Sequence, residues 1–155
     1  MTSSELIILN FEEVRRRSLK LWAAITPDIY NWKPDEDAMT FIEMVRHVLE
    51  SEDFYHRLAS NRGNVNDYVS PWEGRPYTTL QDEIDFAKPY REKFIETIRS
   101  FTPEDLNTLV IRSDRDQRRL LGDYLLRFAY HESVHTGQFL SYFRTLGLDR
   151  VLIWD

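Results

Sequence analysis

Helical signals dominate this sequence and constrain its fold more than any other feature. In the first segment, the residues that recur every three or four positions are Phe11, Val14, Ser18, Leu21 and Ile25. Such spacing places side chains on one face of a helix. It predicts a first helix of about 20 residues that ends before Pro27. The signal for strands is poor along the whole chain.

A second helix is predicted to begin after Thr40 and to run to about Ser60. Glu43 lies three residues after Thr40, so the two side chains can form a capping box at the helix start. The apolar stripe of this helix consists of Phe41, Met44, Val45, Val48, Tyr55 and Ala59.

A third helix fits the residues from about Thr79 to Ser100. We expect Pro89 to perturb it, because an interior proline removes a backbone donor and clashes with the preceding turn. Thr102 as N-cap and Pro103 at the first helical position then predict a short turn of helix. The charged stretch "RSDRDQRR" that follows is interpreted as a loop.

The last helix is predicted from about Leu121 to Leu146, with Gly147 placed for a C-terminal cap. Residues 61–77 are rich in Gly, Pro, Asn and Asp and indicate a long connection. Its aromatic residues suggest that it packs on the body of the protein: Tyr68, Trp72 and Tyr77. Four long helices with a long connection between the second and third predict an all-α fold, a four-helix bundle. At 155 residues, we expect residues 1–155 to form a single domain.

Charge and composition exclude several classes of partner. The formal net charge of −6 argues against nucleic acid as a partner. The basic run "VRRRSLK", from Val14 to Lys20, is interpreted as a solvated helix face. No apolar run approaches the roughly 18 residues needed to cross a membrane, and "LIIL" is too short for a signal peptide. We therefore expect a cytoplasmic protein with no membrane partner.

The chain has no cysteine. Disulfides and thiolate metal sites are therefore excluded. If the chemistry uses a thiol, a substrate or cofactor must supply it.

The sequence "YHESVHTGQ", residues 130–138, carries the pattern H-E-x-x-H in His131, Glu132 and His135. Residues four apart on a helix project about 40° from one another, so both imidazoles can reach one metal ion. Zinc proteases with this pattern take a third ligand downstream. No histidine follows His135 here, so the pattern does not favour a zinc protease. A third histidine ligand must come from upstream.

Both histidines of the last helix fall within its core-facing stripe. A buried imidazole must be hydrogen-bonded or ligated, because leaving it unpaired costs about 1–3 kcal/mol. A shared metal ion explains two such histidines economically. The alternative is a pair of core histidines bonded to tyrosine and backbone groups.

The third ligand is either His47 or His56. They lie nine residues apart on the second helix and point in opposite directions, so at most one can serve. Periodicity leaves the choice open and slightly favours His56.

The segments "WKPDEDAMTFIEMVRHVLESE" and "HESVHTGQFLSYFRTLG" resemble the DinB-like family of bacterial four-helix-bundle proteins, which overlaps a larger group of thiol-dependent transferases. The resemblance covers most of the chain. Phe143 and Thr136 depart from the commoner Leu and Arg of the family. The residues that fall on family positions are Trp32, Pro34, His47, His131, His135, Gly137, Gln138, Tyr142, Arg144 and Gly147.

The resemblance implies that His47 is the third ligand and that His56 is a surface or flank residue. It also implies one divalent transition metal per chain, with zinc or nickel as the expected ion. The implied function is a metal-dependent transferase or hydrolase that acts on a small molecule, with a low-molecular-weight thiol as a candidate substrate. The alternative is a non-enzymatic metal-binding or stress-response dimeric bundle.

Two polar residues of the last helix are candidates for roles beside the metal. Glu132 is a candidate general base, although its flank position is equally consistent with a surface salt bridge. Gln138 could orient a ligand or bound water through a hydrogen bond, or could serve as an ordinary hydrogen-bonding residue of the core.

Three further expectations concern other parts of the chain. Glu52 lies near the centre of the second helix's apolar stripe and should have a partner, such as an arginine of a neighbouring helix. The arginines of the charged loop are usually just solvated but could hold an anionic substrate: Arg112, Arg115, Arg118 and Arg119. An aromatic content of 14% favours a homodimer, since Trp and Tyr are enriched at interfaces.

Overall fold

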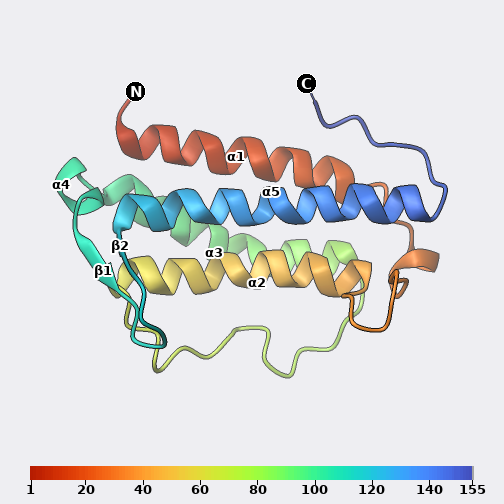
Figure 1. Cartoon of the computed structure of the whole chain (residues 1–155), viewed down its shortest axis with the longest axis horizontal. Helices are drawn as coiled ribbons and strands as arrows, with labels where there is room; N and C mark the ends of the chain where they lie inside the picture. The colour runs from red at the N-terminus through yellow and green to blue at the C-terminus, as the bar shows by residue number, and fades with distance from the viewer. Residues whose placement is uncertain (155) are drawn as a thin grey trace.

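The structure, a computed structural model, describes residues 1–154. Four long helices make up most of the chain, as predicted (Figure 1). In chain order the elements are α1 (Ser3–Trp22), the 3-10 turn η1 (Pro27–Ile29), α2 (Phe41–Ser60), α3 (Leu80–Ser100), α4 (Pro103–Leu106), β1 (Leu109–Ile111), β2 (Arg118–Leu120) and α5 (Leu121–Thr145).

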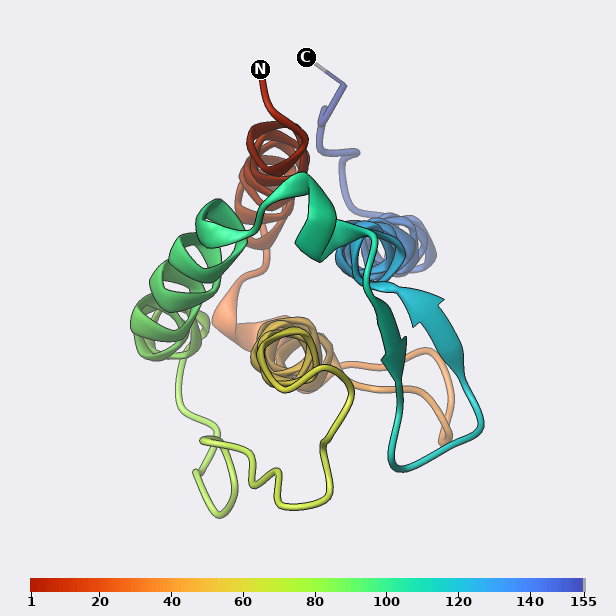
Figure 2. The same ribbon diagram turned by 90° about the vertical axis from the view of Figure 1, so that its left-hand side faces the viewer.

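The long helices surround a common core in the order α1, α5, α2, α3 (Figure 2). Helix α5 therefore lies beside both α1 and α2, while α3 lies diagonally across from it. The long connection between α2 and α3 runs along the outside of α2 (Figure 1). This arrangement brings the middle of α2 next to the middle of α5. None of the helices among residues 1–154 is long and apolar enough to cross a membrane.

Most helix ends follow the sequence signals. Thr40 caps α2 and forms the predicted capping box with Glu43, and Thr102 caps α4. Gly147, with φ 68°, follows α5 in the left-handed conformation that favours glycine. Helix α1 has 20 residues and ends before Pro27, as predicted, but it stops at Trp22, so Ile25 lies beyond it while remaining buried. Helix α3 continues through Pro89.

The charged stretch interpreted as a loop is the turn of a small hairpin. Strands β1 and β2 pair antiparallel, with Leu109 opposite Leu120 and Ile111 opposite Arg118. Each strand has only three residues, which is too short for an alternating pattern to stand out. The interpretation of the charged stretch as a loop was therefore wrong for Arg118 and Arg119, which belong to β2, and β1, which precedes the stretch, was not predicted.

Gly63 links the end of α2 to this hairpin. Its φ of +96° suits glycine, and a Cβ there would lie 2.1 Å from the carbonyl oxygen of Ile111. The Gly63 carbonyl also accepts a hydrogen bond from the backbone of Ser113. The close approach of two backbones explains why only glycine fits at this position.

We predict that Gly63→Ala lowers the free energy of unfolding by about 2–3 kcal/mol, because it adds a backbone clash to an unfavourable dihedral angle. Gly74 is a matched control, since its φ is +71° but a Cβ there would meet nothing within 4 Å. Gly74→Ala should cost only about 1 kcal/mol. Urea unfolding of both variants measures the difference, and equal losses would show that the contact with Ile111 contributes nothing.

Two apolar clusters fill the bundle, one toward each end. Phe11, Phe94 and Phe128 belong to the cluster nearer α4, and Phe41 and Phe139 belong to the cluster at the opposite end. Polar side chains occupy the middle of the helices between the two clusters. Because this layer contains the candidate ligands, the apolar clusters hold it in place from both sides.

Candidate metal centre

Three histidines meet at the contact between α2 and α5. His47 comes from α2, and His131 and His135 come from successive turns of α5. The Nε2 atom of His131 lies 3.1 Å from Nε2 of His47 and 3.1 Å from Nε2 of His135. Ligand atoms of the three side chains all lie within 4.8 Å of one another. The structure thus brings together the three residues predicted as ligands.

These separations suit a shared ion. Imidazole nitrogens bind zinc at about 2.0–2.1 Å, so neighbouring ligand atoms of a tetrahedral site lie roughly 3.3 Å apart. The two separations of 3.1 Å are close to that value. His135 is buried, while His47 and His131 are half-buried.

Gln138 fixes the protonation of one ring. Its Oε1 atom lies 2.6 Å from Nδ1 of His135. Because an amide oxygen can only accept, Nδ1 of His135 carries the proton and its Nε2 presents a lone pair. Gln138 is thus placed for the orienting role predicted for it.

Hydrogen bonds alone satisfy this cluster poorly. Since Nε2 of His135 carries no proton, its contact with His131 requires a proton on Nε2 of His131. That nitrogen then has no lone pair for a proton from His47, so one proton cannot serve both contacts of 3.1 Å. A cation between the three lone pairs would resolve the conflict.

The three imidazoles are held in the neutral form that binds metals. Burial lowers the pKa of His131 to about 4, with further contributions from His135 and His47. Burial also lowers the pKa of His47 and of His135. At neutral pH each ring therefore keeps one nitrogen lone pair that can bind a metal. The alternative, a pair of core histidines, requires hydrogen bonds from His131 and His135 to tyrosine or backbone groups. Within residues 1–154 neither histidine makes such a bond.

His56 lies outside this site. Its ring stacks on Phe94 at a centroid distance of 5.1 Å, and its Nε2 lies 2.9 Å from Oγ1 of Thr97. Both partners belong to α3, on the opposite side of α2 from α5. The flank position expected for His56 is the one observed.

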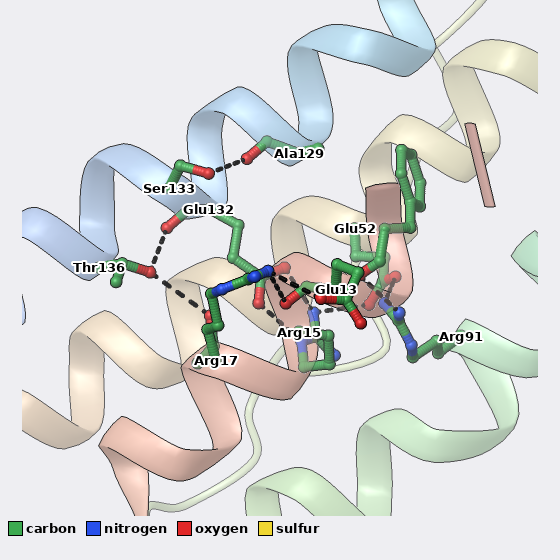
Figure 3. A network of polar contacts seen from close by, with 11 residues as sticks. Glu13, Arg15, Arg17, Glu52, Arg91, Ala129, Glu132, Ser133 and Thr136 are labelled. Carbon is green, nitrogen blue, oxygen red and sulfur yellow. Dashed lines mark hydrogen bonds and ion pairs between the residues drawn. The ribbon is translucent and has the colours of Figure 1, made fainter. Parts of the chain in front are cut away.

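Glu132 lies beside the histidines in sequence but faces α1. Its side chain is buried, and its two oxygens accept hydrogen bonds of 2.8 and 3.1 Å from Arg15 (Figure 3). Burial alone would raise the pKa of Glu132, but the Arg15 guanidinium outweighs it and holds the pKa below its ordinary value. The salt bridge considered for Glu132 therefore exists, but it is buried and not at the surface.

The ion pair between Arg15 and Glu132 also determines which way the histidines of α5 point. Residue 132 lies about 100° around the helix from residue 131, so holding Glu132 against α1 turns His131 and His135 toward α2. This geometry favours a positioning role for Glu132 over the role of general base. The general base therefore remains a prediction.

Arg15 belongs to a larger buried network. Its Nη2 atom lies 3.0 Å from an oxygen of Glu52, and the other oxygen of Glu52 accepts from Arg91. We name these four residues the buried ion layer: Arg15, Glu52, Arg91 and Glu132, one from each long helix. The prediction that Glu52 pairs with an arginine of a neighbouring helix is confirmed, and the solvated-face interpretation of the basic run was wrong for Arg15.

The loop arginines proposed for an anionic substrate have local partners. Arg112 and Arg115 both pair with Asp114. Arg118 lies 3.9 Å from Asp116 and Arg119 3.0 Å from Asp123. Arg115, Arg118 and Arg119 thus agree with an ordinary solvated segment, whereas Arg112 is buried and its guanidinium lies 5.1 Å from the centroid of the Phe54 ring. None of these ion pairs involves the histidines.

Comparison with known proteins agrees with this geometry. Residues 10–139 match the sequence profile of the DinB superfamily. The uncharacterized protein YjoA of Bacillus subtilis (strain 168) is 31% identical over 150 residues, which cover 95% of this chain and 93% of YjoA.

Solved structures show the same architecture. The crystal structure of the DinB-like protein YjoA from Bacillus subtilis superposes with a TM-score of 0.73 at 25% identity, over 95% of both chains. A DinB-like protein from Bacillus cereus ATCC 10987 gives a TM-score of 0.75 over 94% of both chains. At 14% identity, the second likeness concerns the fold alone.

Proposed function

This chain belongs to the DinB superfamily, and we propose that it is a metal-dependent enzyme that holds one divalent transition-metal ion at His47, His131 and His135. The observation that carries the proposal is the meeting of three neutral imidazoles whose Nε2 contacts one proton cannot satisfy. Zinc and nickel are the expected ions, since imidazole suits both.

Three protein ligands indicate catalysis more than structure, because structural zinc sites usually close all four positions. When bound, such an ion supplies Lewis acidity that lowers the pKa of a water or thiol reaching it. The chain provides the rest of the site: Gln138 keeps the His135 lone pair directed inward, and the Arg15–Glu132 pair holds α5 against α1 so that His131 and His135 face α2.

We further propose that the substrate is a small molecule and that the reaction is a transfer or hydrolysis that uses a low-molecular-weight thiol. The support is chemical. The chain has no cysteine of its own, and two of the three ligands are partly exposed to solvent.

Elemental analysis of protein purified without a metal-affinity tag should give close to one transition-metal ion per chain. His47→Ala, His131→Ala and His135→Ala should each weaken binding by roughly 100-fold or more, since each removes one of three ligands. His56→Ala is the matched control and should keep the metal. Metal retained by His47→Ala would contradict the ligand set.

Gln138→Leu tests the hydrogen bond to His135 separately. It leaves all three ligands in place, and we expect metal affinity to fall by about 10- to 100-fold.

Turnover is a second and independent question. Metal-loaded protein should convert an electrophile in the presence of a small thiol, and His135→Ala should not. Glu132→Gln that keeps the metal and loses turnover would support the general base. Metal bound at one ion per chain without turnover of any thiol or electrophile would favour the non-enzymatic alternative.

A further inference from the structure

The outward face of α5 differs in character from the exposed faces of α2 and α3, although α1 also exposes leucines. All seven exposed residues from Leu126 to Ser141 are uncharged. On α3, by contrast, six of the nine exposed residues are charged. Leu126, Tyr130 and Val134 are exposed by 53%, 70% and 44%, whereas α2 and α3 expose no large apolar side chain to this degree.

Five residues of this face form a continuous row that we name the outer stripe: Leu126, Tyr130, Val134, Gly137 and Ser141. Their spacing of three and four residues is that of a helix seam packed against another helix. The row lies on the side of α5 away from the core, so it is separate from His131 and His135. All five of its residues are exposed.

From the outer stripe we infer that this chain forms a two-fold symmetric dimer in which α5 packs antiparallel against α5 of a second copy. The order of side-chain sizes along the stripe indicates that its partner is the same stripe of a second copy. Large residues occupy its first half, and Gly137 and Ser141 occupy its second half. A Cβ at Gly137 would meet nothing within 4 Å, so the surface there has room for a partner's side chain.

An antiparallel pair centred between residues 133 and 134 places each large residue against a small one. Leu126 then faces Ser141, and Tyr130 faces Gly137. In a two-fold interface both contacts occur twice. A parallel pair would instead set Tyr130 against Tyr130 and leave Gly137 opposite Gly137. The stripe is therefore complementary to itself in one direction only.

The area agrees with a pair of this kind. Trp154 is 76% exposed and lies beside Ser133 and Gly137 along one edge of the stripe. With residue areas of roughly 150–250 Å², Leu126, Tyr130, Val134 and Trp154 expose on the order of 500 Å² of side chain. A standard interface buries about 800 Å² per partner, so polar residues at the rim need to add only the remainder.

The absence of cysteine allows a direct test. Val134→Cys places one thiol beside the proposed axis, and mild oxidation should convert the protein to a disulfide-linked dimer. The control is Lys88→Cys on the exposed face of α3, which should remain largely uncrosslinked. Equal cross-linking of the two variants would overturn the proposal.

Light scattering should give a mass twice that of the chain at micromolar concentration. Gly137→Leu has room in the single chain but would meet Tyr130 of the second copy, so it should weaken the dimer about tenfold or more. Circular dichroism should show the helices unchanged. A wild-type protein that is monomeric at high micromolar concentration, or a Gly137→Leu variant that dimerises as well as wild type, would overturn the inference.

Discussion

Arg15→Met should lower the free energy of unfolding by about 3–5 kcal/mol, because it leaves a buried carboxylate without its partner. Both oxygens of Glu132 bond to Arg15, and Glu132 is only 1% exposed. Glu52 keeps Arg91, so most of the loss comes from Glu132. Methionine fills similar volume, which keeps the cavity contribution small.

The loss should shrink as the pH falls from 7 to 5. In the wild type the pKa of Glu132 is lowered, so its contribution is present above the ordinary carboxyl pKa and is lost only as the pH falls through the lower folded value. Without Arg15, burial raises the pKa of Glu132. The variant then regains stability as the pH falls and the carboxyl is protonated. Urea unfolding at both pH values measures the change.

Arg16→Met is the matched control, since Arg16 pairs with Glu13 at the surface and the same substitution there should cost about 1 kcal/mol or less. Arg15→Met combined with Glu132→Gln removes both charges and should recover part of the loss. An Arg15→Met variant no less stable than Arg16→Met would show that the buried ion layer does not stabilise the fold.

Glu83→Leu should also lower the free energy of unfolding by about 3–5 kcal/mol, through a second buried pair. Glu83 is fully buried and accepts hydrogen bonds from Arg46 of α2 at 3.0 and 2.5 Å. It also accepts one from Nε1 of Trp72, in the long connection. Leucine in its place would leave a buried guanidinium and a buried indole N–H without this partner.

This change should loosen the long connection in particular. Arg46 also donates to the carbonyls of Arg75 and Pro76, and its guanidinium stacks 3.6 Å above the ring of Tyr77. Hydrogen exchange in residues 64–79 should therefore rise more than exchange in α5. Glu92→Leu on the exposed face of α3 is the control and should change stability by about 0.5 kcal/mol or less. Unchanged exchange in residues 64–79 would contradict the role given to Glu83.

The sequence predicted the helices well because their signals are local. A capping box needs only Thr40 and Glu43, and a helix stop needs only Gly147. The packing of the long connection was also predicted from its aromatic residues. Trp72 is buried and Tyr68 donates to Asp53, while Tyr77 remains 48% exposed and packs on Arg46.

The hairpin and the role of Arg15 were missed for different reasons. Strands of three residues carry too little pattern to be seen, and β1 and β2 are held by the pairing of Val110 with Arg119. Arg15 stands in a basic run, which is usually solvated. The sequence did contain one indication of a buried arginine. Glu52 lies in the middle of an apolar stripe and therefore required a cation from another helix.

By itself the sequence determined the four helices, their apolar faces and the placement of His131 and His135 on one side of the last helix, because helical periodicity relates residues only a few positions apart. Periodicity did not decide whether His47 or His56 is the third ligand, and only the family resemblance favoured His47. The tertiary structure decided that His47 meets the other two histidines, that Glu132 turns to Arg15, and that the outer stripe of α5 remains exposed. Those contacts join residues far apart in the chain, and they depend on which helices become neighbours when the apolar faces close on one another.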